Sequence, residues 1–197
     1  QGPIGKKPFS NNEVRICFIG TLSHRSGLEK YIRALGSLPK EMKSNIKLLI
    51  AGTGPHASFL EDLVKNYDAP VEFLGWIDRQ QIIELMHGCD FGLLPYDLPD
   101  FHLSLPNKLV DYVRGGLPIF SCTRGEVKRF IEFNSAGVWT ETCEVSISKQ
   151  LVNFLTLDFS FSRMSIRKIY DEQFAPDKVF RLVEKAVFEL NNNRKEE

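Results

Sequence analysis

The chain has 197 residues, and its 25 Lys and Arg side chains are balanced by 25 Asp and Glu side chains. This length fits one domain or two very small ones, and a composition of 43% hydrophobic and 25% charged residues is typical of a packed protein rather than a disordered one. The balanced charge removes the electrostatic basis for non-specific binding to nucleic acid, so we expect no nucleic-acid partner.

No apolar run reaches the ~18–20 residues that cross a bilayer, and no signal peptide is evident, so we expect neither a membrane-spanning helix nor secretion. The four cysteines are widely spaced and form no Cys-x-x-Cys pair and no zinc-ligand pattern with histidine. We therefore expect reduced thiols in a cytoplasmic protein, no disulfide bond and no metal site. The cysteines are Cys17, Cys89, Cys122 and Cys143.

After a loop-like start, residues 1–12, which we expect to be a linker, short apolar runs alternate with segments of helical periodicity. The runs are mostly continuous rather than alternating, which favours strands buried on both faces of a parallel sheet. The expected strands are Val14–Gly20, Ile46–Ala51, Val71–Leu74, Asp90–Leu94, Pro118–Cys122 and Ala136–Thr140. The expected helices between them are Leu28–Leu38, Ser58–Tyr67, Arg79–His87, Lys108–Arg114 and Val127–Phe133.

Six strands separated by helices predict a doubly wound α/β domain with right-handed crossovers. Beyond Glu144 the strand pattern stops, and helices are expected over Ser146–Leu157, Ser162–Glu172 and Asp177–Asn191, with Pro176 at the favoured first position of the last helix. The expected fold class is thus α/β, a Rossmann-like parallel sheet of about six strands with a C-terminal helical tail. Residues 13–191 would form this domain, and residues 192–197 a polar tail.

Ligands of an open parallel sheet bind at the carboxyl ends of the strands, near the topological switch point. The residues that directly follow each expected strand are therefore the candidates for a site. These candidates are Gly20, Thr21 and Arg25 after the first strand, Gly54 after the second, Gly75, Trp76 and Ile77 after the third, and Ser104, Asn107, Lys108 and Asp111 after the fourth.

Helix N-termini, together with Arg25 and Lys108, favour an anion such as a phosphate or a diphosphate. A carboxylate such as Asp111 accepts hydrogen bonds from sugar hydroxyls, as an acidic residue does for ribose in dinucleotide-binding folds. By their chemistry alone, these residues indicate a nucleotide-type ligand.

Each candidate also has an ordinary structural interpretation. Glycines after parallel strands are mostly turn residues. Lys108 fits a solvated helix position, and Asp111 fits an ion-pair partner of Lys108 or Arg114 at helical spacing. Trp76 fits a core or rim aromatic residue. The composition and spacing leave both interpretations open.

Four segments in order resemble the C-terminal, donor-binding domain of the group 1 retaining glycosyltransferases of GT-B fold. They are FIGTLSHRSGLEKYIRAL, IKLLIAGTGP, VEFLGWIDRQQIIELMHGCDFGLLPY and SLPNKLVDYVRGGLPIFS. The resemblance runs from about Val14 to about Asn191, and it implies one half of a GT-B fold. It also implies an N-terminal Rossmann-like domain, which binds the acceptor, outside this sequence, so we expect the chain to be about half of a longer protein.

The resemblance implies that the loop after the first strand contacts the donor diphosphate. Thr21 stands where the first of two basic residues is common and Arg25 near the second, so Lys108 is a candidate substitute for the missing cation. Backbone N–H groups around Ser104–Asn107 would also face the phosphates.

The segments at Gly54 and at Gly75, Trp76 and Ile77 would border the base. The family that the chain resembles carries two glutamates eight positions apart. The resemblance places Asp111 at the second, which implies that it holds the ribose, and Leu103 at the first. No catalytic residue is assigned.

The function implied is transfer of a sugar from a UDP-, GDP- or dTDP-sugar to a hydroxyl acceptor, lipid-linked or glycan, in polysaccharide biosynthesis, without a cofactor. The full-length protein would be cytoplasmic or peripheral to the inner face of the membrane. Thr21 and Leu103 leave open a non-catalytic nucleotide-sugar binding module, and a GT-B-type nucleotide-sugar epimerase is a further alternative. We expect this chain alone to be inactive.

Overall fold

The computed structural model describes residues 13–157, 159 and 161–193, and it contains a six-stranded sheet in the order β3-β2-β1-β4-β5-β6. Every pair of neighbouring strands is parallel. The strands are β1 Val14–Ile19, β2 Ile46–Ala51, β3 Val71–Gly75, β4 Phe91–Leu94, β5 Ile119–Ser121 and β6 Gly137–Trp139. The predicted Rossmann-like α/β fold is confirmed.

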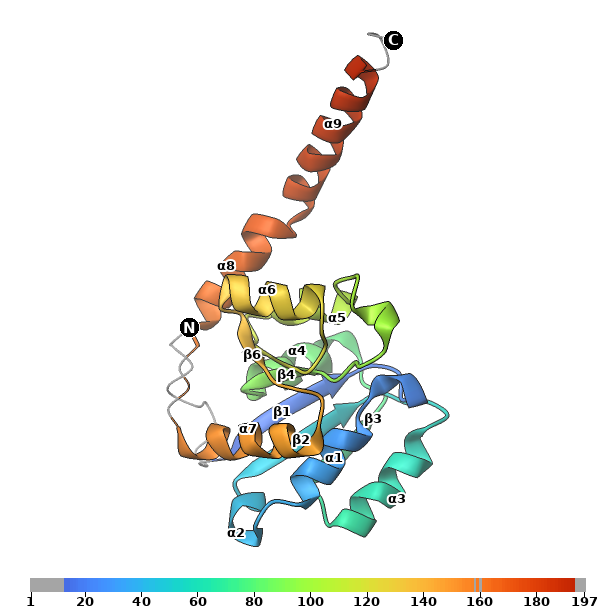
Figure 1. The fold of residues 1–197 in the computed structure, drawn as a ribbon, viewed down its shortest axis with the longest axis vertical. Helices are drawn as coiled ribbons and strands as arrows, with labels where there is room; N and C mark the ends of the chain where they lie inside the picture. Colours follow the sequence, from blue (N-terminus) through green and yellow to red (C-terminus); the bar gives the residue numbers. More distant parts are fainter. Residues whose placement is uncertain (1–12, 158, 160, 194–197) are drawn as a thin grey trace.

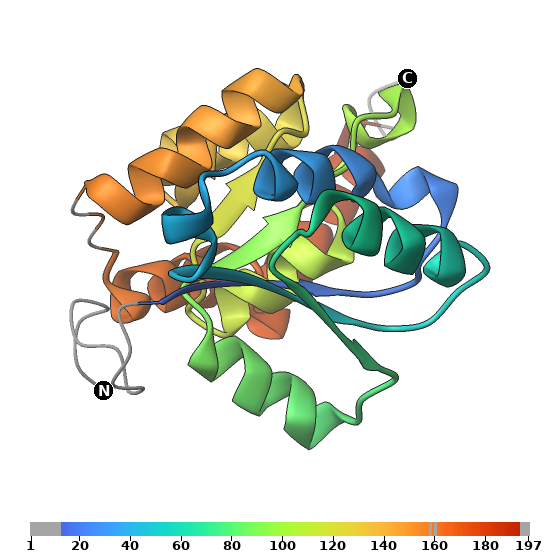
Figure 2. The ribbon, with the colours of Figure 1, turned by 90° about the horizontal axis from the view of Figure 1, so that it is seen from below.

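Helices cover both faces of the sheet, as the continuous apolar strands predict (Figures 1 and 2). In β1, Ile16 and Phe18 are buried in the core on one face, whereas Cys17 is buried in the core on the other. The first core is covered by α1 Glu29–Gly36, α3 Ala57–Tyr67 and α7 Glu144–Thr156. The second is covered by α4 Arg79–Gly88, α5 Asn107–Arg114, α6 Glu126–Asn134 and α8 Arg163–Gln173.

The order of the strands places the topological switch point between β1 and β4, which are neighbours in the sheet. The chain leaves β1 toward α1 on one face and leaves β4 toward α5 on the other. A crevice at the carboxyl ends of β1 and β4 is therefore the expected place for a ligand.

Several short elements differ from the sequence prediction. The helix α2, Lys40–Lys43, was not predicted, because four mostly polar residues carry no apolar periodicity. The 3-10 turns η1, His24–Ser26, and η2, Pro99–Phe101, lie in segments that were expected to be loops. Helix α3 begins at Ala57, one residue before the expected Ser58, and His56 is its N-cap residue.

Arg163, the first residue of α8, joins this helix to the C-terminal end of α4. Its guanidinium donates hydrogen bonds to the carbonyl oxygens of Met86 at 3.1 Å and His87 at 3.3 Å, and to that of Cys89. These carbonyls close the C-terminal end of α4, where backbone acceptors lack helical partners. Burial lowers the pKa of Arg163, which remains a cation at the negative end of the helix dipole.

The last helix, α9 Pro176–Asn193, begins at the predicted proline and ends two residues beyond the predicted Asn191; it runs away from the body of the domain (Figure 1). The predicted linker 1–12 and residues 194–197 lie outside the described residues. All four cysteines are free, and Cys143 is exposed. Among the described helices, none has the length and apolarity that crossing a membrane requires.

Candidate functional site

Lys108 lies over the switch point of the sheet. It follows Asn107 in the first turn of α5, and its ammonium group lies 5.2 Å from the centre of the Phe18 ring and 5.6 Å from that of the Tyr96 ring. Its Nζ and Cε atoms also lie beside Gly20, so a Cβ atom at position 20 would collide with them. Phe18 lies in β1, Gly20 follows β1 and Tyr96 follows β4, so Lys108 lies against the ends of both strands at the switch point.

Nearby negative charge only partly offsets the cost of burying the Lys108 ammonium. Burial lowers its pKa, and the negative charge of Asp111 acts in the opposite direction. Within the described part of the chain, Lys108 forms no ion pair. Because a desolvated charge without a partner is costly, this ammonium favours an anionic ligand.

Arg25, the other predicted cation, is already paired. Its guanidinium donates to Asp100 at 2.6 Å and lies 5.8 Å from the centre of the Phe101 ring. A second ion pair of the same kind joins Lys30 to Asp97 at 2.8 Å. The segment that follows β1 is therefore attached to the segment that follows β4 by two charge pairs.

The glycines after β2 have a packing role. A Cβ atom at Gly52 would collide with the carbonyl oxygen of Gly20, and one at Gly54 would collide with that of Leu22. The amide of Leu22 donates to the carbonyl of Thr53 at 3.0 Å, which joins the two loops. The close approach of the two backbones therefore explains both glycines without any ligand.

The loop after β3 presents an exposed indole. Gly75 has a φ of +67°, and its carbonyl accepts a hydrogen bond from the amide of Gly52 at 2.6 Å. Trp76 is 76% exposed, so it is not a core residue, and Ile77 is half-buried. Asp78 then caps α4 through a reciprocal hydrogen-bond pair with Gln81. This loop is rigid at both ends and exposes Trp76 at the carboxyl edge of the sheet.

Asp111 is exposed one turn after Lys108 on α5. Among the described residues it forms no ion pair with Lys108 or Arg114, so the ion-pair interpretation does not hold in this structure. The remaining polar candidates after β1 and β4 are also exposed. They are Thr21 and Ser104 on the loops and Asn107 at the start of α5, and the neighbouring Leu103 is 87% exposed.

Tyr112, next to Asp111, is buried and fixes α5 on the sheet. Its hydroxyl accepts a hydrogen bond from the Ile19 amide at 3.3 Å and lies 3.4 Å from the carbonyl oxygens of Cys17 and Leu93. A Cβ atom at Gly92 would collide with the Tyr112 ring. This contact sets the position of the helix that carries both Lys108 and Asp111.

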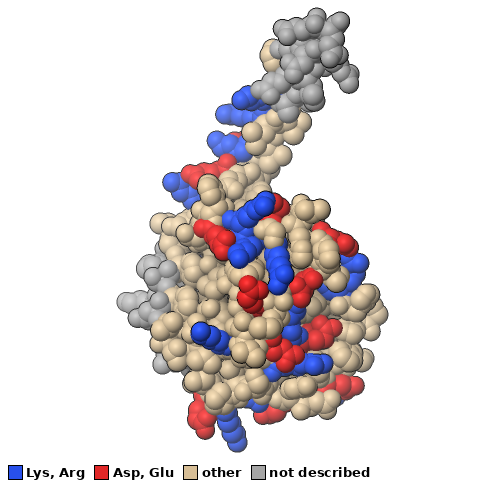
Figure 3. Space-filling view, in the orientation of Figure 1, with Lys and Arg blue, Asp and Glu red and all other residues tan. Residues whose placement is uncertain are grey.

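Sequence reasoning did not select four residues beside the two cations. They are Tyr96, Asp97, Asp100 and Phe101. The first two directly follow β4, so the rule that selected the other candidates also applies to them. On the face shown in Figure 3, Lys and Arg side chains are interspersed with Asp and Glu side chains.

The family model described as glycosyl transferases group 1 matches residues 4–168. The chain belongs to this family. An uncharacterized glycosyltransferase of Methanocaldococcus jannaschii is 27% identical over 131 residues, which are 66% of this chain and 32% of that protein. An α-1,4-N-acetyl-D-galactosaminyltransferase of Campylobacter jejuni, named for an undecaprenol-linked glycan acceptor, is 35% identical over 67 residues, 34% of this chain and 19% of that protein.

Among solved structures, Anabaena HepE in complex with UDP-glucose has the same fold as this group 1 glycosyltransferase chain. The TM-score is 0.69 at 17% identity, over 90% of this chain and 49% of the other. The predicted family and fold are therefore confirmed. The chain spans about a third of the length of the first relative and about half of HepE.

The described residues contain no group of three or more His, Cys, Asp or Glu side chains arranged to hold a metal ion. The absence of a metal in the reaction stays a prediction.

Proposed function

We propose that this chain is the donor-binding part of a glycosyltransferase and that it binds the diphosphate of a nucleotide sugar at Lys108. The observation that carries the proposal is the half-buried ammonium at the switch point, with no ion-pair partner in the described residues. Membership of the group 1 family supports the reaction class. The UDP-glucose complex of the similarly folded HepE makes UDP the first donor nucleotide to test.

In the proposed reaction, the acceptor oxygen bonds to the sugar, the bond from the sugar to the nucleoside diphosphate breaks and the diphosphate leaves with its electron pair, and the acceptor hydroxyl gives up its proton to the leaving diphosphate or to water. The charge that develops on the diphosphate is stabilised by Lys108 and by the N-terminus of α5, both held in place before the reaction. Asp111, exposed one turn later, would accept hydrogen bonds from the ribose hydroxyls. Trp76 would border the base.

The remaining part of the full-length protein would supply the acceptor site. Helix α9 supports this partner, because its described apolar side chains are exposed: Val179, Phe180, Leu182, Val183 and Phe188. Val179, Phe180, Leu182 and Val183 lie on one face of the helix and form an apolar stripe, whereas Lys178, Arg181, Glu184 and Phe188 lie on the other face, so the helix is amphipathic. We propose that the apolar stripe packs on the N-terminal half of the full-length protein. The relatives are long enough to contain such a half.

A lipid-linked or glycan acceptor is the proposed second substrate, in keeping with the name of the Campylobacter relative. An acceptor of this kind would place the full-length protein at the cytoplasmic face of a membrane. Polysaccharide assembly is the corresponding proposed process.

The second candidate function is a nucleotide-sugar binding module without catalysis. Leu103 favours it, since an 87% exposed apolar side chain stands where the family carries an acid. The two functions are distinguished in the full-length protein. Release of UDP from UDP-sugars that depends on an acceptor supports the transferase, whereas UDP binding without turnover across donors and acceptors supports the binding module.

Binding is tested with this chain by calorimetric titration with UDP. We expect a dissociation constant of ~0.1–1 mM, because only one half of the site is present. Lys128→Met is the matched control. Like Lys108, Lys128 lies over an aromatic ring, that of Trp139, but it belongs to α6 and not to the first turn of α5. Equal loss of affinity in Lys128→Met and Lys108→Met would reject Lys108 as the phosphate ligand.

A further inference from the structure

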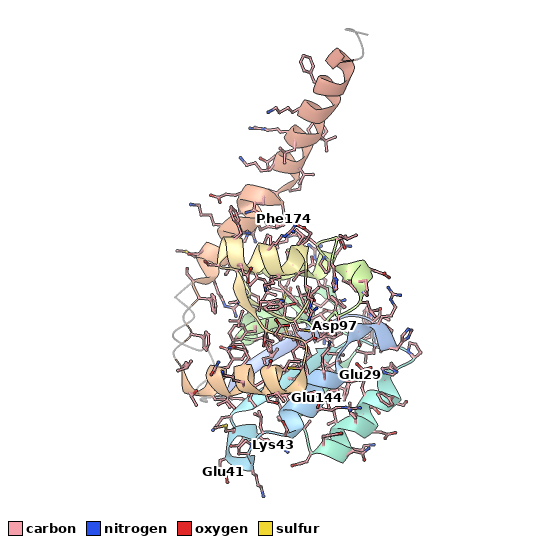
Figure 4. All side chains as sticks on the ribbon, viewed as in Figure 1. Glu29, Glu41, Lys43, Asp97, Glu144 and Phe174 are labelled. Atoms are coloured by element: carbon pink, nitrogen blue, oxygen red, sulfur yellow. The ribbon has the colours of Figure 1, made fainter. Side chains whose placement is uncertain are left out.

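The segment after β4, residues 96–102, lies beside both predicted phosphate ligands, Arg25 and Lys108. Figure 4 shows Asp97 beside the start of α1, where Glu29 is labelled, and the Lys30–Asp97 pair fixes this contact. The Arg25–Asp100 pair, at 2.6 Å, fixes the next turn of the segment. Both carboxylates of this segment therefore pair with cations that follow β1.

Arg25 and Lys108 each lie near one ring of the same aromatic stack. The rings of Tyr96 and Phe101 are stacked, with centroids 4.4 Å apart and an angle of 15° between planes. The Lys108 ammonium lies 5.6 Å from the Tyr96 ring, and the Arg25 guanidinium lies 5.8 Å from the Phe101 ring. The two cations thus lie near the same pair of rings, although Arg25 follows β1 and Lys108 lies in the first turn of α5.

The Arg25–Asp100 pair is also easily exchanged. The side chains are 47% and 69% exposed, and the structure shows a single hydrogen bond between them, from one terminal nitrogen to Oδ2 of the carboxylate. A guanidinium has five N–H donors, and within the described part of the chain Arg25 forms this one side-chain hydrogen bond. Exposed ion pairs of this kind contribute little to stability because both charges are well hydrated.

We propose that Asp100 is a competing anion that holds Arg25 near the donor site, and that a bound nucleoside diphosphate displaces it. Arg25 then pairs with the diphosphate together with Lys108, which lies near the other ring of the same aromatic stack. Asp100 thereby weakens donor binding in exchange for keeping the guanidinium in place before the ligand arrives. This inference rests on the proposed function, because it requires a diphosphate at Lys108.

The test is the affinity of Asp100→Asn for UDP, measured by calorimetry with uridine as the second probe. Removal of the competing charge should tighten UDP binding about two- to fivefold, the size expected for an exposed ion pair, and leave uridine binding unchanged. In an Arg25→Ala background, Asp100→Asn should have no effect on UDP affinity. Asp97→Asn is the matched control, because it removes one charge from the same segment and frees Lys30, whose side chain is only 16% exposed.

The outcomes separate the two proposals. If the wild-type chain binds no UDP, the proposed function fails and the role of Asp100 fails with it. If the wild-type chain binds UDP but Asp100→Asn is unchanged, weaker, or improved only as much as Asp97→Asn, the role of Asp100 alone is wrong. Thermal melting of each variant verifies the fold, and Asp100→Ser replaces Asp100→Asn if the latter does not fold.

Discussion

Lys108 occupies the space beside Gly20 that a side chain at position 20 would need. Gly20 also has a φ of +151°, a backbone conformation that residues with a Cβ atom rarely adopt. The end of β1 and the first turn of α5 therefore pack closely against each other at the place where we expect the anion to bind.

Gly20→Ala should move the Lys108 ammonium away from the crevice. We expect a lower melting temperature and at least a severalfold weaker affinity for UDP, because the new methyl group collides with Nζ and Cε of Lys108. Melting curves and UDP titrations measure the two effects. Affinity equal to that of the wild type in a folded variant would show that the Gly20–Lys108 contact has no role in binding.

The pH dependence of binding should follow Lys108. Burial lowers the pKa of this lysine in the folded chain, so its charged form opposes folding at neutral pH, and that cost disappears as the pH rises through the folded-state pKa toward the ordinary value. A bound diphosphate favours the charged form and raises the pKa. The UDP affinity of the wild type relative to that of Lys108→Met should therefore fall as the pH rises through the lowered pKa of Lys108 toward the ordinary lysine value of about 10.4. Parallel profiles for the two proteins would contradict this assignment.

Asp111→Asn should weaken UDP and UMP to the same extent, because the ribose is common to both. Loss of a charge-assisted hydrogen bond costs ~1.5–3 kcal/mol, which is about ten- to hundredfold in affinity. The exposed position of Asp111 and its lack of an ion pair in the described residues predict a small change in melting temperature. Leu103→Ala is the control for a neighbouring exposed residue, and unchanged affinity in Asp111→Asn would exclude the ribose role.

Tyr112→Phe should affect stability more than chemistry. The hydroxyl bridges the Ile19 amide and the carbonyls of Cys17 and Leu93 inside the core, so its removal should cost ~1–2 kcal/mol of unfolding free energy. Urea unfolding measures this value, and Tyr170→Phe, on the half-buried face of α8, is the matched control. Equal stability of the two variants would show that the buried hydroxyl is not a structural anchor.

The sequence predicted the layout of the domain because strands buried on both faces leave continuous apolar runs, and the six runs match the six strands. It placed Lys108 at the carboxyl edge for the same reason. It did not predict that Asp100 pairs with Arg25, because 75 positions separate them and only the folded chain brings the two loops together. The packing role of Gly54 was also hidden, since it depends on the path of the loop at Leu22.

The most direct test of the account is a calorimetric titration of UDP into the wild-type chain and into Lys108→Met, which keeps the length of the side chain and removes its charge. We expect the wild type to bind with a dissociation constant of ~0.1–1 mM and Lys108→Met to bind at least about tenfold more weakly, with both proteins folded. No binding by the wild type at several times this concentration, or equal affinity of the two proteins, would contradict the assignment of Lys108 as the diphosphate ligand.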